Sequence, residues 1–274
     1  MGSSVVTDSS LVGDIDVIGL TDGVDSPLSE DKRVFRLHGE PDLEFTPFPL
    51  SFPELLAKDD RLHFLLFRER KKLEQSVCLF GEAEAHRKLL SSVCSIPLPK
   101  ETILKFTKIL DLEIRGISRT GGQSSVNAFY LLATLLGYSH FRSGPVKPKW
   151  MFRELRGCGC FEAEACARML VEPLHVHGLS NVLAVLDTTG PFLDYWGTKG
   201  TAWKDAKASF RHDKDASALT TLYCMHGYAT RAMASDSRDV FEPYSQVIGR
   251  LSKDSDQVSK LLGNSLEKLL LRLQ

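Results

Sequence analysis

The residues with the clearest capacity for chemistry are cations in a stretch that contains no acid. Residues 114–153 carry six Lys or Arg side chains and neither Asp nor Glu. These cations are Arg115, Arg119, Arg142, Lys147, Lys149 and Arg153. Cations neutralise phosphates, and interleaved aromatic side chains such as Trp150 offer faces on which bases stack. The pattern predicts a surface that binds RNA or another polyanion; the alternative is a capping loop followed by core aromatics.

A glycine loop lies inside this basic stretch. Residues 119–125 read Arg-Thr-Gly-Gly-Gln-Ser-Ser and lead into an apolar helix. Glycines, hydroxyls and the free N–H groups of a helix start together form a cradle for anions. The Gly-Lys-Ser/Thr ending of a P-loop is absent. The predicted phosphate-binding residues therefore include Gly121, Gly122 and Ser124, and a phosphate-handling enzyme built around this loop remains an alternative to an RNA-binding surface.

Cysteines and histidines cluster further along the chain. Cys158, Cys160, Cys166, His175 and His177 fall within twenty positions and are ligands that zinc accepts. Their spacing matches no zinc module known to us, and Cys-Gly-Cys departs from the Cys-x-x-Cys motif of thiol oxidoreductases. Helix 161–171 predicts a buried Cys166. We keep a zinc site at Cys158, Cys160, His175 and His177, in a protein–protein adaptor, as a further alternative, and otherwise expect no cofactor.

The elements that must position these residues are predicted to be mostly helical. Apolar residues recur at helical spacing in nine segments. These are residues 82–93, 100–110, 124–136, 148–155, 161–171, 202–210, 216–234, 240–251 and 256–273. Four strands are predicted before them, at 33–38, 43–45, 61–68 and 76–80. We therefore expect an α+β chain, predominantly α, with a small antiparallel sheet near the N-terminus followed by a helical bundle.

Charge divides the chain unevenly. Residues 1–30 hold six acids and no Lys or Arg, whereas the remainder holds all 34 Lys and Arg and the other 29 of the 35 acids. The first segment also has few large apolar side chains, which predicts disorder. We expect a disordered acidic arm at 1–31, an α+β subdomain at 32–118 and a helical subdomain at 119–274. An acidic arm on a basic body is typical of proteins that meet polyanions.

The last predicted helix is the most clearly amphipathic one. Its apolar stripe includes Leu262, Leu266, Leu269 and Leu273. Packing on its own bundle is the ordinary outcome. A terminal helix can also be lent to a neighbouring subunit, because it can leave without unthreading the core. These leucines are therefore predicted oligomerisation residues.

Taken together, these patterns favour a non-catalytic, self-associating structural protein with a basic surface that binds RNA. A viral nucleoprotein or matrix protein has this design, by analogy of architecture alone. The sequence shows no signal peptide and no transmembrane segment. The six cysteines are expected to be reduced thiols, which indicates a cytoplasmic or nuclear location.

Overall fold

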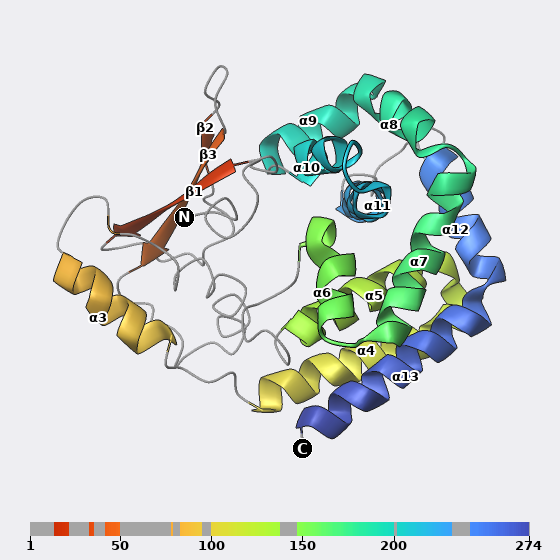
Figure 1. Ribbon diagram of the computed structural model, residues 1–274, viewed down its shortest axis with the longest axis horizontal. Coiled ribbons are helices and arrows are strands. Elements are labelled where there is room, and N and C mark those ends of the chain that lie inside the picture. The colour runs from red at the N-terminus through yellow and green to blue at the C-terminus, as the bar shows by residue number, and fades with distance from the viewer. Residues whose placement is uncertain are drawn as a thin grey trace. The chain divides into compact units, whose positions relative to one another are not determined.

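The computed structural model describes residues 14–21, 33–35, 42–49, 78, 83–94, 100–137, 147–199, 202–231 and 242–273. The chain divides into two compact units (Figure 1). One unit comprises Met1–Lys105 with Phe141–Gly144, and the other comprises Phe106–His140 with Pro145–Gln274. The helix α4 (Lys100–Thr120) contains the boundary at Lys105. The predicted arm and subdomain limits remain predictions.

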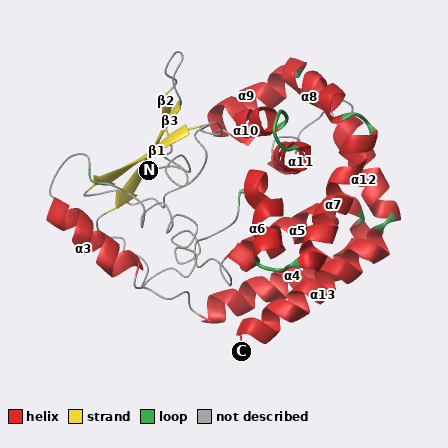
Figure 2. Cartoon of the chain, viewed as in Figure 1, coloured by secondary structure: helices red, strands yellow, loops and turns green. Residues whose placement is uncertain are grey.

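Among the described residues, the first unit contains a small sheet and one helix in addition to the start of α4. Its strands are β1 (Asp14–Thr21), β2 (Arg33–Phe35) and β3 (Asp42–Pro49), in the order β1-β3-β2 (Figure 2). β1 runs parallel to β3, and β2 runs antiparallel to β3 with Arg33 opposite Phe45. The helix is α3 (Ala83–Cys94).

The predicted fold class is wrong in its sheet. The strands that the structure describes form a mixed sheet, because β1 joins it in parallel from within residues 1–31. Averaged composition over that segment hides the apolar residues of β1, which are Ile15, Val17, Ile18 and Leu20. The strands expected at 61–68 and 76–80 lie outside the described residues, except Cys78, which is in neither strand nor helix. The described part of the chain is overwhelmingly helical.

The second unit is a helical bundle, and its described residues contain no strand. After α4 come α5 (Gly122–Leu136), the 3-10 turn η4 (Pro148–Trp150), α6 (Met151–Gly157), α7 (Phe161–Val176), α8 (Leu179–Thr188), α9 (Gly190–Lys199), α10 (Ala202–Ser209), α11 (Lys214–Arg231), α12 (Glu242–Lys253) and α13 (Ser255–Leu273). Each of the nine segments predicted to be helical overlaps a helix among the described residues. α4 continues to Thr120 instead of ending at Leu110, and α8 and α9 were not predicted.

The core forms around α7, which contacts α5, α6, α8, α11, α12 and α13. α5 is apolar on nearly every side, which is typical of a helix enclosed by others. Phe129, Phe152 and Phe192 are the largest side chains removed from solvent. Each such burial contributes roughly 1.5–3 kcal/mol before the entropy of ordering is counted. These contacts hold α5, α7, α12 and α13 in a fixed arrangement, and most of the residues singled out above lie on or beside these helices.

Among the described helices, none is by itself both long and apolar enough to cross a membrane. α7 and α8 meet that requirement only as a pair, and a bend of 74° separates them.

Candidate functional site

The glycine loop joins α4 to α5 and packs against α12. Gly121 has φ 68°, a left-handed conformation that favours glycine. The N–H of Gly122 donates a 2.9 Å hydrogen bond to Ser252 Oγ, and Ser252 Oγ donates in turn to the carbonyl of Ile248. A Cβ on Gly122 would lie 2.4 Å from that carbonyl oxygen. The two glycines therefore allow close approach of α5 to α12, and the amide expected to hold a phosphate already has a partner.

Ser124 serves the same junction. Its side chain is buried, and its Oγ lies 2.5 Å from Thr120 Oγ1 in a hydroxyl–hydroxyl hydrogen bond. Thr120 Oγ1 also bonds the carbonyl of Gly116. A hydroxyl held in this way cannot turn toward solvent without breaking a contact. The structure thus places Gly121, Gly122 and Ser124 together in a helix junction.

Lys149 is the most surprising of the predicted phosphate contacts. Only 5% of the residue is exposed, and its Nζ lies 2.8 Å from Oδ1 of Asp205, which is itself 7% exposed. The pair joins η4 to α10 inside the bundle. A buried ammonium with a bonded carboxylate has no surface to offer to a phosphate. Sequence reasoning missed Asp205 because it lies 56 positions away.

The other predicted cations are dispersed. The guanidinium of Arg153 lies over the ring of Trp150, with its carbon 4.4 Å from the ring centroid, and forms a salt bridge with Glu154. Lys147 is half-buried at the start of η4. Arg142 lies outside the described residues. Arg153, Trp150 and Lys149 come together at η4 and α6, but Arg115 and Arg119 lie on α4.

The outer side of α4 gathers exposed cations around apolar side chains. Lys108, Leu112, Arg115 and Arg119 are spaced i, i+4, i+7 and i+11, so they share one side of the helix. All four are exposed, Leu112 to 68%, and Ile109 beside them is 47% exposed. We call these five residues the α4 face. Lys108, Ile109 and Leu112 were missed because they precede the acid-free stretch 114–153; extending the helical period beyond Leu110 would have placed them on one side of a helix with Arg115 and Arg119.

The predicted zinc ligands separate into two places. Cys158 Sγ and Cys160 Sγ are 2.9 Å apart at the turn before α7. His175, in the last turn of α7, bonds Asp215 at 3.0 Å, and His177 is exposed beyond it. Fifteen residues of helix at about 1.5 Å each put some 22 Å between the two ends. The described part of the chain holds no group of three or more His, Cys, Asp or Glu residues that could bind a metal ion.

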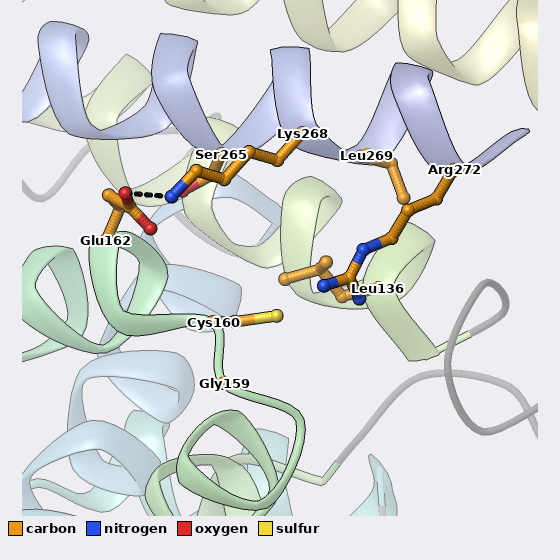
Figure 3. A pocket seen from close by; sticks show the side chains of 8 residues that line it. All are labelled: Leu136, Gly159, Cys160, Glu162, Ser265, Lys268, Leu269 and Arg272. Atoms are coloured by element: carbon orange, nitrogen blue, oxygen red, sulfur yellow. Dashed lines mark hydrogen bonds and ion pairs between the residues drawn. The ribbon is translucent and has the colours of Figure 1, made fainter.

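A shallow pocket opens beside the two cysteines (Figure 3). It encloses about 310 Å³, open solvent included, and it is lined by Leu136, Gly159, Cys160, Glu162, Ser265, Lys268, Leu269 and Arg272. Lys268 Nζ reaches across from α13 to the carboxylate of Glu162 and lowers the pKa of that carboxyl. Burial, reinforced by the Cys158 thiol, raises the pKa of Cys160 to about 12. The pocket therefore presents one sulfur atom near Arg272 and the Lys268–Glu162 ion pair.

A second polar cluster lies inside the bundle. His226 on α11 bonds Tyr244 Oη of α12 at 2.8 Å and Asn127 Oδ1 of α5 at 2.7 Å. Tyr130 Oη donates to the carbonyl of Leu219, and burial raises the pKa of Tyr130 and of Tyr244. His226 and Tyr244 are buried, so the cluster ties three helices together. The sequence contains no local signal for it, because its members are far apart in the chain.

Glu164 supplies a test of the electrostatics near the pocket. Burial alone would raise its pKa, but hydrogen bonds from Arg168 and Arg156 outweigh burial and lower it. The resulting stability is fully present above the ordinary carboxyl pKa of about 4.3 and is lost as the pH falls through the lower folded-state pKa. Glu164→Gln should therefore destabilise the protein by about 1 kcal/mol at pH 7, since both arginines are half exposed.

Urea unfolding at neutral and at strongly acidic pH measures this effect. The difference between Glu164→Gln and the unmodified protein should shrink at the acidic pH. Glu267→Gln removes an exposed carboxylate of α13 for which the structure describes no ion pair, and it should change little at either pH. An equal deficit for Glu164→Gln at both pH values would mean that packing, and not charge, sets the contribution of Glu164.

The leucines of α13 face their own bundle. Leu262, Leu266 and Leu269 are buried against α5 and α7, while nothing is described of the side chain of Leu273. An intersubunit role for α13 would require these three side chains to leave their own core.

Comparison of the chain with protein-family models, with curated proteins and with solved structures gave no match. A functional proposal therefore depends on the geometry of this chain's own residues.

Proposed function

We propose that the helical unit is a non-catalytic module that binds single-stranded RNA through the α4 face. The observation that carries the proposal is the alignment of Lys108, Arg115 and Arg119 on one exposed side of α4. RNA binding was expected for the whole stretch 114–153. Burial of Lys149 and the capping of Trp150 by Arg153 move the proposed surface to α4.

The charges of this face are available to a polyanion. Neither Lys108 nor Arg119 has an ion-pair partner among the described residues, and Arg115 pairs with Asp111 one turn earlier on the same helix. An exposed pair of that kind is worth only about 0.3–0.5 kcal/mol, so a phosphate can displace the carboxylate. Three cations along about 17 Å of helix can contact successive phosphates of one strand.

The remaining residues of the face indicate how such binding would behave. Ile109 and Leu112 offer aliphatic contact to sugars and base faces but no hydrogen bonds to base edges. Phosphate contacts fix position without reading sequence. We therefore expect RNA binding that is strongly salt-dependent and nearly independent of sequence.

Removal of two cations from the face should weaken binding and flatten its salt dependence. For the double variant Lys108→Gln with Arg119→Gln, the slope of log K against log salt should become less steep by about 1.4, because each single-strand phosphate contact contributes about 0.7. Fluorescence anisotropy of labelled RNA oligomers at a series of salt concentrations measures both the affinity and the slope.

The matched control removes two exposed cations elsewhere in the same unit. Arg211 and Lys214 lie at the α10–α11 turn, so Arg211→Gln with Lys214→Gln produces the same change in net charge. Equal losses in the two double variants would contradict binding at the α4 face. Absence of RNA binding at low salt would contradict the proposal altogether, as would selective binding of anionic lipid vesicles instead of RNA.

A further inference from the structure

The turn between α6 and α7 holds two thiols against each other. Cys158 Sγ lies 2.9 Å from Cys160 Sγ, and Gly159 between them has φ 69°. Three backbone hydrogen bonds fix the turn: the N–H groups of Cys158, Gly159 and Cys160 donate to Glu154, Arg156 and Leu155. The left-handed residue brings both side chains to one side of the turn. The proximity of the thiols is thus a property of the folded backbone.

Both thiols are partly exposed, in contrast to the other cysteines described in this unit. Cys158 and Cys160 are half-buried, and Cys160 lines the pocket, whereas Cys166 and Cys224 are fully buried. Lys268, which is paired with Glu162, and Arg272 line the same pocket, and Arg272 favours a negative charge on Cys160 whereas Glu162 opposes it (Figure 3). A small anionic reagent can therefore reach this pair, while burial protects Cys166 and Cys224.

We propose that Cys158 and Cys160 form a reversible dithiol–disulfide pair that exchanges with small anionic disulfides. The inference is independent of RNA binding, because it concerns a different part of the unit. Glutathione disulfide, which carries a net negative charge at neutral pH, serves as the probe.

The exchange proceeds in two balanced steps. The thiolate of Cys158 attacks one sulfur of glutathione disulfide, forms a mixed disulfide and releases one glutathione thiolate. The thiolate of Cys160 then attacks Cys158 Sγ, forms the Cys158–Cys160 bond and releases the second glutathione thiolate. The two protein thiols are oxidised, the glutathione disulfide is reduced, and the two thiol protons end on two glutathione molecules. Burial raises the pKa of Cys160, so this thiol acts in the second, intramolecular step, where proximity compensates for a small thiolate fraction.

Differential alkylation and mass spectrometry test the proposal on the full chain. Trypsin releases residues 157–168 as one peptide that contains Cys158, Cys160 and Cys166. After incubation with glutathione disulfide, the mass of this peptide should be lower by two hydrogen atoms, which corresponds to one internal disulfide. Cys166 should remain a free thiol that is alkylated once the protein is denatured. Cys158→Ser and Cys160→Ser should stop at a mixed disulfide or remain reduced. Wild-type protein without the internal bond in excess glutathione disulfide would overturn the proposal.

Two glycines of the same turn give a matched pair of variants. Gly159→Ala should lower the equilibrium constant for the internal disulfide about tenfold, because alanine disfavours the left-handed conformation that aligns the thiols. Gly157 has no left-handed φ, and a Cβ added there would meet open space. Gly157→Ala should therefore leave the equilibrium constant for the internal disulfide unchanged. Equal constants in the two variants would show that the turn does not align the thiols.

The role of the pocket cations has its own readout. Arg272→Gln should slow oxidation by glutathione disulfide several-fold and leave oxidation by the neutral bis(2-hydroxyethyl) disulfide unchanged. Equal slowing with both reagents would mean that the variant disturbs the turn, and no slowing with either would remove the preference for anionic disulfides.

Discussion

Replacing Lys149 with methionine is expected to lower the free energy of unfolding of the helical unit by about 3–5 kcal/mol. The methionine fills a similar space but leaves Asp205 buried without the only side-chain partner that the described residues give it. The ion pair itself adds little net stability, because both charges lost their hydration when they were buried. Removing the lysine leaves the carboxylate with neither water nor a partner, which costs several times more. Buried pairs of this kind therefore show large losses on removal of one member.

The double variant Lys149→Met with Asp205→Leu separates the charge effect from packing. Because neither charge remains buried, most of the lost stability should return, and the double variant should lie within about 1–2 kcal/mol of the unmodified protein. The three tryptophans, Trp150, Trp196 and Trp203, all belong to the helical unit, so their fluorescence during urea unfolding reports on this unit. A single variant that unfolds at the urea concentration of the unmodified protein would contradict burial of the pair.

Gly122→Ala is expected to destabilise the helical unit by about 2 kcal/mol. The new methyl group would lie 2.4 Å from the Ile248 carbonyl oxygen and 2.9 Å from Leu251 Cβ, so α5 and α12 must move apart. Overpacking of this kind costs about 1–3 kcal/mol, which exceeds the gain of up to about 1 kcal/mol from helix propensity. The hydrogen bond from Gly122 to Ser252 would be strained by the same movement.

A glycine on α12 provides a control for which the expected change in the free energy of unfolding has the opposite sign. Gly249 is helical and exposed, and nothing lies within 4 Å of the Cβ position, so Gly249→Ala should stabilise the unit by about 0.5–1 kcal/mol. Urea unfolding followed by tryptophan fluorescence measures both variants. If Gly122→Ala were as stable as Gly249→Ala, the glycine loop would not be a packing junction, and an open loop that binds phosphate would regain support.

The local pattern of the sequence predicted most helices because helix formation depends on neighbours in the chain. Apolar spacing located nine helical segments, including the stripe of α13 whose Leu262, Leu266 and Leu269 are buried. Local signals also misled. No helix was predicted between residues 171 and 202, whereas α8 ends at Thr188 and α9 begins at Gly190, with a short break that local composition does not distinguish from a longer one. The parallel strand β1 was hidden in an acidic, serine-rich segment.

The candidate site could be predicted only as far as its residues act locally. Cations and glycines gather in residues 114–153, and Cys158 and Cys160 are neighbours, whatever fold the chain adopts. Which cations face solvent, and whether the Gly122 amide is open to an anion, depends on the tertiary structure, because Asp205 lies 56 positions from Lys149 and Ser252 lies 130 positions from Gly122. The physical reason is that helical periodicity is fixed by bonds between residues four apart, whereas burial and pairing depend on which helices the core brings together.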